Sequence, residues 1–98
     1  MKEKGILKLN VADKQRTMNY TTEDDKIYML TSSGSQKVKD LMLNRKATLL
    51  LDDEEIIATA TIIRELDSVK EMYDKMTSEK NNHFKQMRDD LILLEFSK

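Results

Sequence analysis

The stretch KIYMLTSSGSQKVKDLM, residues 26–42, passes from a strand through a tight turn into a helix, and the rest of the fold can be built outward from it. Ile27 and Met29 occupy alternate positions, which is typical of a strand and places its end near Thr31. Val38, Leu41 and Met42 follow at the i, i+3, i+4 spacing of one helix face. The sequence therefore predicts a strand, a serine-rich turn and an amphipathic helix that ends near residue 44.

The first turn of this helix contains lysine and no acid, although the chain holds 18 Asp and Glu. Helix N-termini carry partial positive charge and favour Asp or Glu, so another source of negative charge is indicated. Hydroxyls, free backbone amides, an ammonium group and a permissive glycine could converge here on one phosphate: Ser32, Ser33, Gly34, Ser35 and Lys37. In the alternative interpretation the serines merely cap the helix, with Ser33 and Gln36 as a capping box, and Lys37 and Lys39 lie in solvent.

The other strands follow from alternation and from short apolar runs. Leu7, Leu9 and Val11 alternate with polar residues, and ADKQ then turns the chain into a weakly apolar second piece. TEDDK is a second turn, and the acidic DDEE joins the runs KATLLL and IIATATII as a hairpin loop. Strands are expected at residues 7–11, 16–22, 26–31, 46–51, 56–63 and 91–96.

A second helix is expected after residue 66. Asp67 or Ser68 can cap it, and Glu71 completes a capping box with Ser68. One apolar stripe is expected along it, continued by Phe84 and Met87: Val69, Met72, Tyr73 and Met76. The order β-β-β-α-β-β-α-β predicts a mainly β fold, a small antiparallel split β-barrel with two helices, and residues 1–98 form a single domain without a linker.

Composition narrows the functional classes. Seventeen Lys and Arg against 18 Asp and Glu do not supply the positive field of a nucleic-acid binder. The absence of cysteine excludes disulfides and thiol chemistry and fits a cytoplasmic location, and neither a signal peptide nor a membrane span is expected. A chain of 98 residues buries only about 60–70% of its unfolded surface, so its margin of stability is thin and its size favours a dimer.

Three further features carry no chemistry in this interpretation. His83 lies in the polar segment KNNHFK and is expected on the surface. The DDEE loop lacks the spacing and central glycine of a calcium loop, so no metal site is predicted. Met29, Met42, Met72 and Met76 fall at apolar positions and are expected to fill the core.

The segment IYMLTSSGSQKVKDLMLNRKATLLLDDEE, residues 27–55, resembles the central part of the pyridoxamine 5′-phosphate oxidase-like, FMN-binding split β-barrel family, among them the short general stress proteins. That pattern has a strand ending in threonine, a short turn, Ser-Arg-Lys, a helix ending near Asn-Pro and an apolar strand. The resemblance covers about residues 26–76. Gln36 and Arg45 depart from it, because they replace its arginine and its proline.

The resemblance implies a cofactor site at two places. Thr31, Ser35 and Lys37 match positions that hold the FMN phosphate, with Ser32 and Gln36 beside them. The preceding strand is implied to run along the flavin ring, with Arg16, Thr17, Met18 and Asn19 as contacts. An ordinary edge strand with polar residues facing water is the alternative for that segment.

The resemblance thus implies an FMN-binding flavoprotein, an FMN-dependent oxidoreductase with the flavin between the subunits of a homodimer. Neither the substrate and electron donor nor catalytic residues can be assigned from the sequence. The alternatives are a cofactor-free split-barrel module for dimerisation or interaction, and an anion or nucleotide binder unrelated to flavin.

Overall fold

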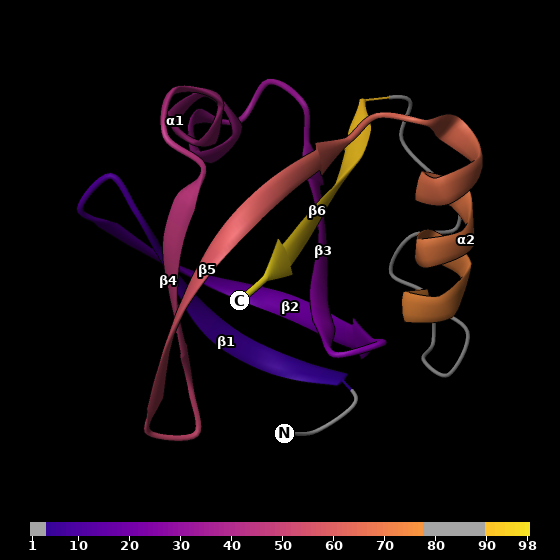
Figure 1. Ribbon diagram of the computed structural model, residues 1–98. Coiled ribbons are helices and arrows are strands. Elements are labelled where there is room, and N and C mark those ends of the chain that lie inside the picture. Colours follow the sequence, from indigo (N-terminus) through magenta and orange to yellow (C-terminus); the bar gives the residue numbers. More distant parts are fainter. Residues whose placement is uncertain (1–3, 78–89) are drawn as a thin grey trace.

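A computed structural model describes residues 4–77 and 90–98 and shows six antiparallel strands closed into one barrel, with two helices outside it (Figure 1). The strands pair in the order β1-β2-β3-β6-β5-β4. The expected mainly β fold and its element order are therefore confirmed. The elements are β1 (Lys4–Val11), β2 (Lys14–Glu23), β3 (Lys26–Ser32), α1 (Gln36–Leu43), β4 (Lys46–Leu51), β5 (Glu54–Ile63), α2 (Leu66–Thr77) and β6 (Leu91–Ser97).

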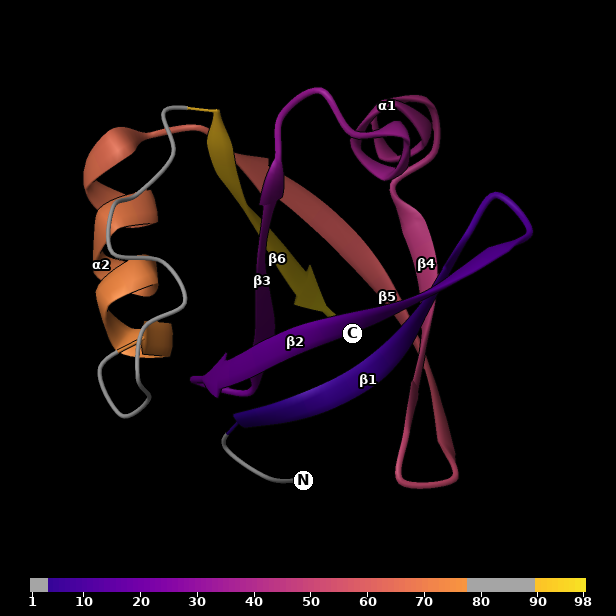
Figure 2. The ribbon, with the colours of Figure 1, turned by 180° about the vertical axis from the view of Figure 1, so that it is seen from behind.

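The hydrogen-bonded ladders between neighbouring strands of the barrel differ in length. β2 pairs with β1 along eight residue pairs, but with β3 only where residues 21–23 face residues 26–28. β1 pairs with β4 through three residue pairs as well, between residues 8–10 and 48–50. Seen from behind, the first half of β2 leaves β3 and runs toward the side on which α1 lies (Figure 2). The split between β2 and β3 thus leaves the 16–19 segment with a partner strand on one side.

Three hairpins use the same two-residue turn. Both central residues have positive φ in Ala12-Asp13, Asp24-Asp25 and Asp52-Asp53, between 50° and 66°. This left-handed pair matches the twist of antiparallel strands, and Asp tolerates it better than most residues. The expected loops ADKQ and DDEE are therefore too long. Their outer residues, Lys14 with Gln15 and Glu54 with Glu55, already belong to β2 and β5.

We expect Asp53→Gly to raise the free energy of unfolding by about 1 kcal/mol, because glycine adopts φ 66° without the steric cost of a Cβ atom. Chemical denaturation measures the change. Asp53→Ala removes the same charge and keeps the Cβ atom, so it should give no gain. Equal gains in both variants would mean that the effect comes from charge.

Apolar side chains that alternate along each strand fill the barrel. The buried cluster draws on all six strands and on α1, and among its members Leu9, Met29, Leu49 and Leu94 are fully inaccessible. α1 covers one end of the barrel through Val38 and Leu41. The expectation that Met42 is buried is wrong: it is 61% exposed, because an eight-residue helix presents a narrow face to the barrel.

α2 packs on the outside of β3 and β6 through a smaller cluster. Val69 and Met72 contact Leu93 there, with Tyr28 and Met76 packed around them. The expected caps are wrong, because the helix begins at Leu66 and so includes Asp67 and Ser68 in its first turn. The Ser68 hydroxyl donates to the Glu65 carboxylate instead of forming a box with Glu71. His83, Phe84 and Met87 lie outside the described residues.

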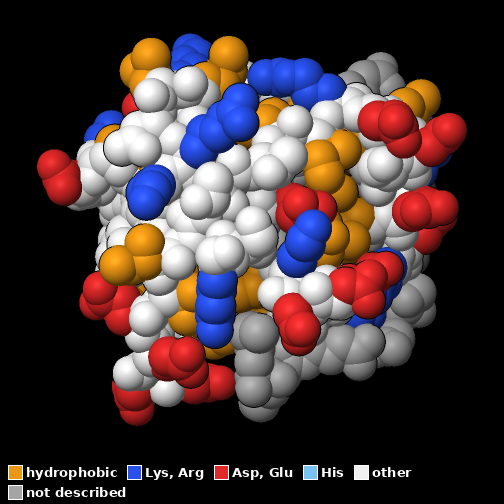
Figure 3. Space-filling model, viewed as in Figure 1, with side chains coloured by type: hydrophobic (Ala, Val, Ile, Leu, Met, Phe, Trp, Pro, Cys, Tyr) orange, Lys and Arg blue, Asp and Glu red, His pale blue; other side chains and the backbone are white. Residues whose placement is uncertain are grey.

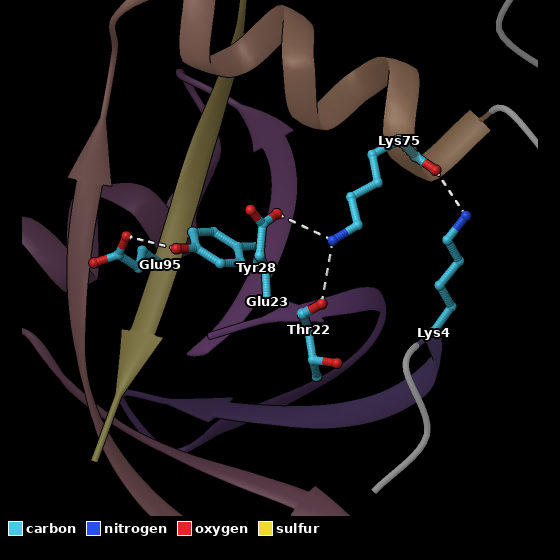
Figure 4. A network of polar contacts seen from close by, with 6 residues as sticks. All are labelled: Lys4, Thr22, Glu23, Tyr28, Lys75 and Glu95. Atoms are coloured by element: carbon cyan, nitrogen blue, oxygen red, sulfur yellow. Dashed lines mark hydrogen bonds and ion pairs between the residues drawn. The ribbon is translucent and has the colours of Figure 1, made fainter. Parts of the chain in front are cut away.

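Polar contacts fasten α2 to the barrel (Figure 4). Lys75 Nζ donates to the Thr22 carbonyl and the Glu23 carboxylate, and Lys4 Nζ donates to the Lys75 carbonyl. On β3, the Tyr28 hydroxyl donates to Glu95 Oε2 at 3.0 Å. The Lys75 and Lys4 contacts tie the C-terminal part of α2 to β1 and β2.

Within residues 4–77 and 90–98, no helix has the length and apolar content needed to cross a membrane.

Stability should fall steeply at alkaline pH through Tyr28. Burial, then the hydrogen bond to Glu95 and the nearby carboxylates, raises the pKa of Tyr28 from 10.0 to about 12. The protonated phenol thus contributes stability that is complete below pH 10 and is lost as the pH rises toward 12. Tyr28→Phe should flatten this decline in urea denaturation series. An unchanged decline in that variant would contradict the assignment.

Candidate functional site

The turn between β3 and α1 leaves the helix start open. The Ser35 amide donates to the Ser32 carbonyl at 3.1 Å, which closes residues 32–35 into a β-turn. Ser35 is the N-cap residue, yet its side chain makes no capping hydrogen bond, and the first turn contains no acid. The expected capping box is wrong, because Gln36 is the first helical residue. Its side-chain amide donates to the Asp40 carboxylate instead. The first amides of α1 are thus left without a side-chain cap.

Two hydroxyls lie together beside this helix start. Thr31 Oγ1 and Ser35 Oγ are 3.5 Å apart, and Thr31 is buried at the end of the barrel. A Cβ atom added to Gly34 would meet nothing within 4 Å, and the residue does not have positive φ. The fold itself therefore does not require glycine at this position. The glycine leaves open space next to the hydroxyl pair.

Two cations from distant parts of the sequence lie close enough here to influence each other electrostatically. Burial lowers the pKa of Lys37, and the positive charge of Arg16 lowers it further, so α1 and the start of β2 bring like charges together. Arg16 Nη1 is buried without a hydrogen-bond partner. Neither cation is paired with an acid in the ranges that the structure describes. A bound anion would stabilise these two cations and could accept a hydrogen bond from the unsatisfied guanidinium nitrogen.

Ser32 differs from its neighbours in where its hydroxyl goes. Its Oγ donates to Asp90 Oδ2 at 2.6 Å, and the Ser33 amide donates to the Asp90 carbonyl at 2.7 Å. Asp90 immediately precedes β6, whose first residue pairs with Ser32. Asp90 could not be predicted as part of this turn, because its link to the turn depends on the pairing of strands far apart in the chain.

The predicted ring contacts on β2 are divided between two faces of the strand. Arg16 and Met18 are half-buried, and Met18 packs against the barrel core. Thr17 and Asn19 are exposed on the opposite face, where they pair with Lys8 and Ile6 of β1. Their four side chains therefore do not line one surface. Since this part of β2 has no pairing with β3, one edge of its backbone remains available.

Charge is distributed unevenly over the surface. On the face seen in Figure 3, several Lys and Arg side chains lie toward α1, and Asp and Glu side chains lie over the α2 side and near the tip of the β4–β5 hairpin. Nowhere in the described ranges do three His, Asp or Glu side chains come together as a metal site would require. The part of the surface suited to a small anion is thus the α1 end.

Comparison with known proteins identifies the fold. No family model matches the sequence, and the comparison with curated proteins gives no match. Among solved structures, a candidate pyridoxamine 5′-phosphate oxidase from Listeria innocua matches with a TM-score of 0.75 at 12% identity, over 98% of this chain and 83% of that one.

Two more structures extend the comparison. General stress protein 26 from Bacillus anthracis matches with a TM-score of 0.66 at 20% identity, over 99% of this chain and 80% of that one. An F420 reductase matches with a TM-score of 0.70 at 13% identity, over 95% of this chain and 83% of that one. The chain therefore has the split β-barrel fold of the pyridoxamine 5′-phosphate oxidase-like proteins, as the resemblance of residues 26–76 implied.

Proposed function

We propose that this protein binds FMN, with the phosphate at the start of α1 and the ring along β2. The observation that carries the proposal is the electrostatic influence of Arg16 on Lys37, two cations without acidic partners among the described residues, one of which has a buried guanidinium nitrogen left unsatisfied. A phosphate monoester brings about two negative charges at neutral pH, enough to neutralise both cations. Oxidase and reductase names among the structural neighbours support a redox function.

The residues present fit the phosphate group. Lys37 and Arg16 would neutralise it, the Thr31 and Ser35 hydroxyls would donate hydrogen bonds, and the uncapped amides of α1 would complete the cradle. When bound, FMN supplies oxidation and reduction of a substrate by transfer of electrons, so the protein is an FMN-dependent oxidoreductase in this proposal. The chain itself holds and orients the group.

A homodimer is part of the proposal. Ile6 and Ile57 are each 65% exposed and project outward from β1 and β5. Ile6 pairs with Asn19, so the exposed face of β1 adjoins the exposed side of β2, from which Thr17 and Asn19 project. A second subunit placed here would bury both isoleucines and enclose a ring lying against β2.

A cofactor-free interaction module is the second candidate, and Gln36 is the observation that favours it. Its amide is tied to Asp40 and exposed, where the resembled pattern has an arginine. Loss of a guanidinium at this position removes a bidentate phosphate donor. The guanidinium of Arg16 counters this argument, since it would supply such a donor from β2.

Titration of the purified protein with FMN and with riboflavin separates the two candidates. Riboflavin has the same ring and lacks the phosphate, so FMN should bind about 100-fold more tightly if the cations and hydroxyls hold that group. Quenching of flavin fluorescence gives both affinities, and sedimentation gives the oligomeric state. Equal affinities would contradict phosphate anchorage, and a dimer that binds neither ligand would favour the interaction module.

A further inference from the structure

We infer that Asp90 is a positioning residue for the phosphate of the bound ligand, acting through Ser32 and Ser33 without contacting the ligand itself. This inference rests on the proposed function. It also gives Ser32 a different role from the direct contact predicted from the sequence, because the hydroxyl of Ser32 is engaged with the Asp90 carboxylate at 2.6 Å.

Asp90 attaches the turn of residues 32–35 to the start of β6. The ladder between β3 and β6 ends at the pair Ser32–Leu91, so the chain beyond Ser32 leaves the sheet. Asp90 extends the attachment past that point, through its carboxylate to Ser32 and through its carbonyl to the Ser33 amide at 2.7 Å. Asp90 thus accepts hydrogen bonds from two successive residues of the turn, Ser32 and Ser33.

The donors of the proposed phosphate site depend on the same turn. The Ser32 carbonyl accepts the hydrogen bond from the Ser35 amide, so the position of Ser32 sets that of Ser35 and of the first residues of α1. Among the described residues, the turn has little internal support besides this bond and the 3.5 Å contact between the Thr31 and Ser35 hydroxyls, since Gly34 contributes no side chain and the Ser35 hydroxyl makes no cap. Anchorage at Asp90 therefore determines whether the Ser35 hydroxyl stays beside that of Thr31.

The charge of Asp90 helps to distinguish this role from others. A carboxylate close to a phosphate weakens its binding by repulsion, so removal of the charge alone should strengthen FMN binding. A loss of affinity on removal of the side chain would then come from geometry. Asn at position 90 retains an oxygen that can accept from the Ser32 hydroxyl and carries no charge.

The test compares FMN with riboflavin in four variants: Asp90→Ala, Asp90→Asn, Ser32→Ala, and Ser32→Ala combined with Asp90→Ala. Asp90→Ala and Ser32→Ala should each lower the preference for FMN over riboflavin about 10-fold, the effect of one hydrogen bond. The double variant should lose no more than either single variant, because both changes break the same bond. Asp90→Asn should keep the wild-type preference or exceed it.

Several results would overturn the inference. A preference that is unchanged or higher in Asp90→Ala would mean that only the charge matters. Additive losses in the double variant would restore Ser32 as a direct phosphate ligand. Equal losses for FMN and riboflavin, with a lower melting temperature, would mean a purely structural role. Wild-type protein that shows no preference for FMN would instead count against the proposed function.

Discussion

Replacing Arg16 or Lys37 by methionine is expected to lower the affinity for FMN about 100-fold, and replacing both about 1,000-fold or more, because each change removes a charge-assisted contact to the phosphate. Methionine keeps most of the side-chain length, so the packing near α1 is preserved. Riboflavin affinity should change little in the same variants. Fluorescence titrations with both ligands measure the effect.

Lys37→Met should not lower the stability of the ligand-free protein. Burial and Arg16 lower the pKa of Lys37, which means that its charged form is less favourable in the folded protein than in water. Lys37→Met should therefore leave the melting temperature unchanged or raise it. FMN affinity of the wild type should also decline at alkaline pH, as Lys37 loses its proton below the usual range for lysine.

Lys39 provides a matched control, since it lies two residues further along α1 and is exposed. Lys39→Met removes the same net charge from the same helix, and we expect less than about a 3-fold change in affinity. Equal losses in the Lys37 and Lys39 variants would show that general attraction, and not a defined site, holds the phosphate.

Leu41→Ala is expected to lower the free energy of unfolding by about 2–5 kcal/mol, the usual cost of removing a large side chain from a packed core. Leu41 is fully buried and fixes α1 on the barrel together with Val38. Chemical denaturation measures the loss. FMN affinity should fall as well, because the helix that supplies Lys37 and the free amides would be less firmly placed.

Met42→Ala is the control on the same helix. Its side chain is 61% exposed, so the change should stay within about 0.5 kcal/mol. The two residues have the same apolar character and adjoin each other in the sequence, so the comparison isolates burial. Similar losses for both would mean that α1 sits on the barrel through a different face.

The fold could be predicted further than the site. Alternation at Leu7, Leu9 and Val11 and along residues 56–63 gives strands directly, since each side chain must face either the core or water. Helix boundaries were less predictable: a serine near a helix start has the chemistry of a cap whether or not the helix begins beside it. Met42 was misplaced because spacing gives the apolar side of a helix but not the width of the contact that its neighbours offer.

The site depends on contacts between elements distant in the chain. The closeness of Thr31, Ser35 and Lys37 to one another could be predicted because they lie within seven residues, and their role as phosphate ligands stays a prediction. The approach of Arg16 to Lys37 was not predictable from spacing, although the resemblance had marked Arg16 as a flavin contact. Asp90 was missed entirely, since a polar residue before the last strand carries no pattern of its own.

The short ladders have a consequence for motion. β2 meets β3, and β1 meets β4, through three residue pairs each, so local unfolding should begin at these two seams and their amide hydrogens should exchange with solvent early. A ligand that contacts both Arg16 on β2 and the start of α1 would hold β2 in place where its pairing with β3 is short. Occupancy would then slow hydrogen exchange in strands that the ligand never touches.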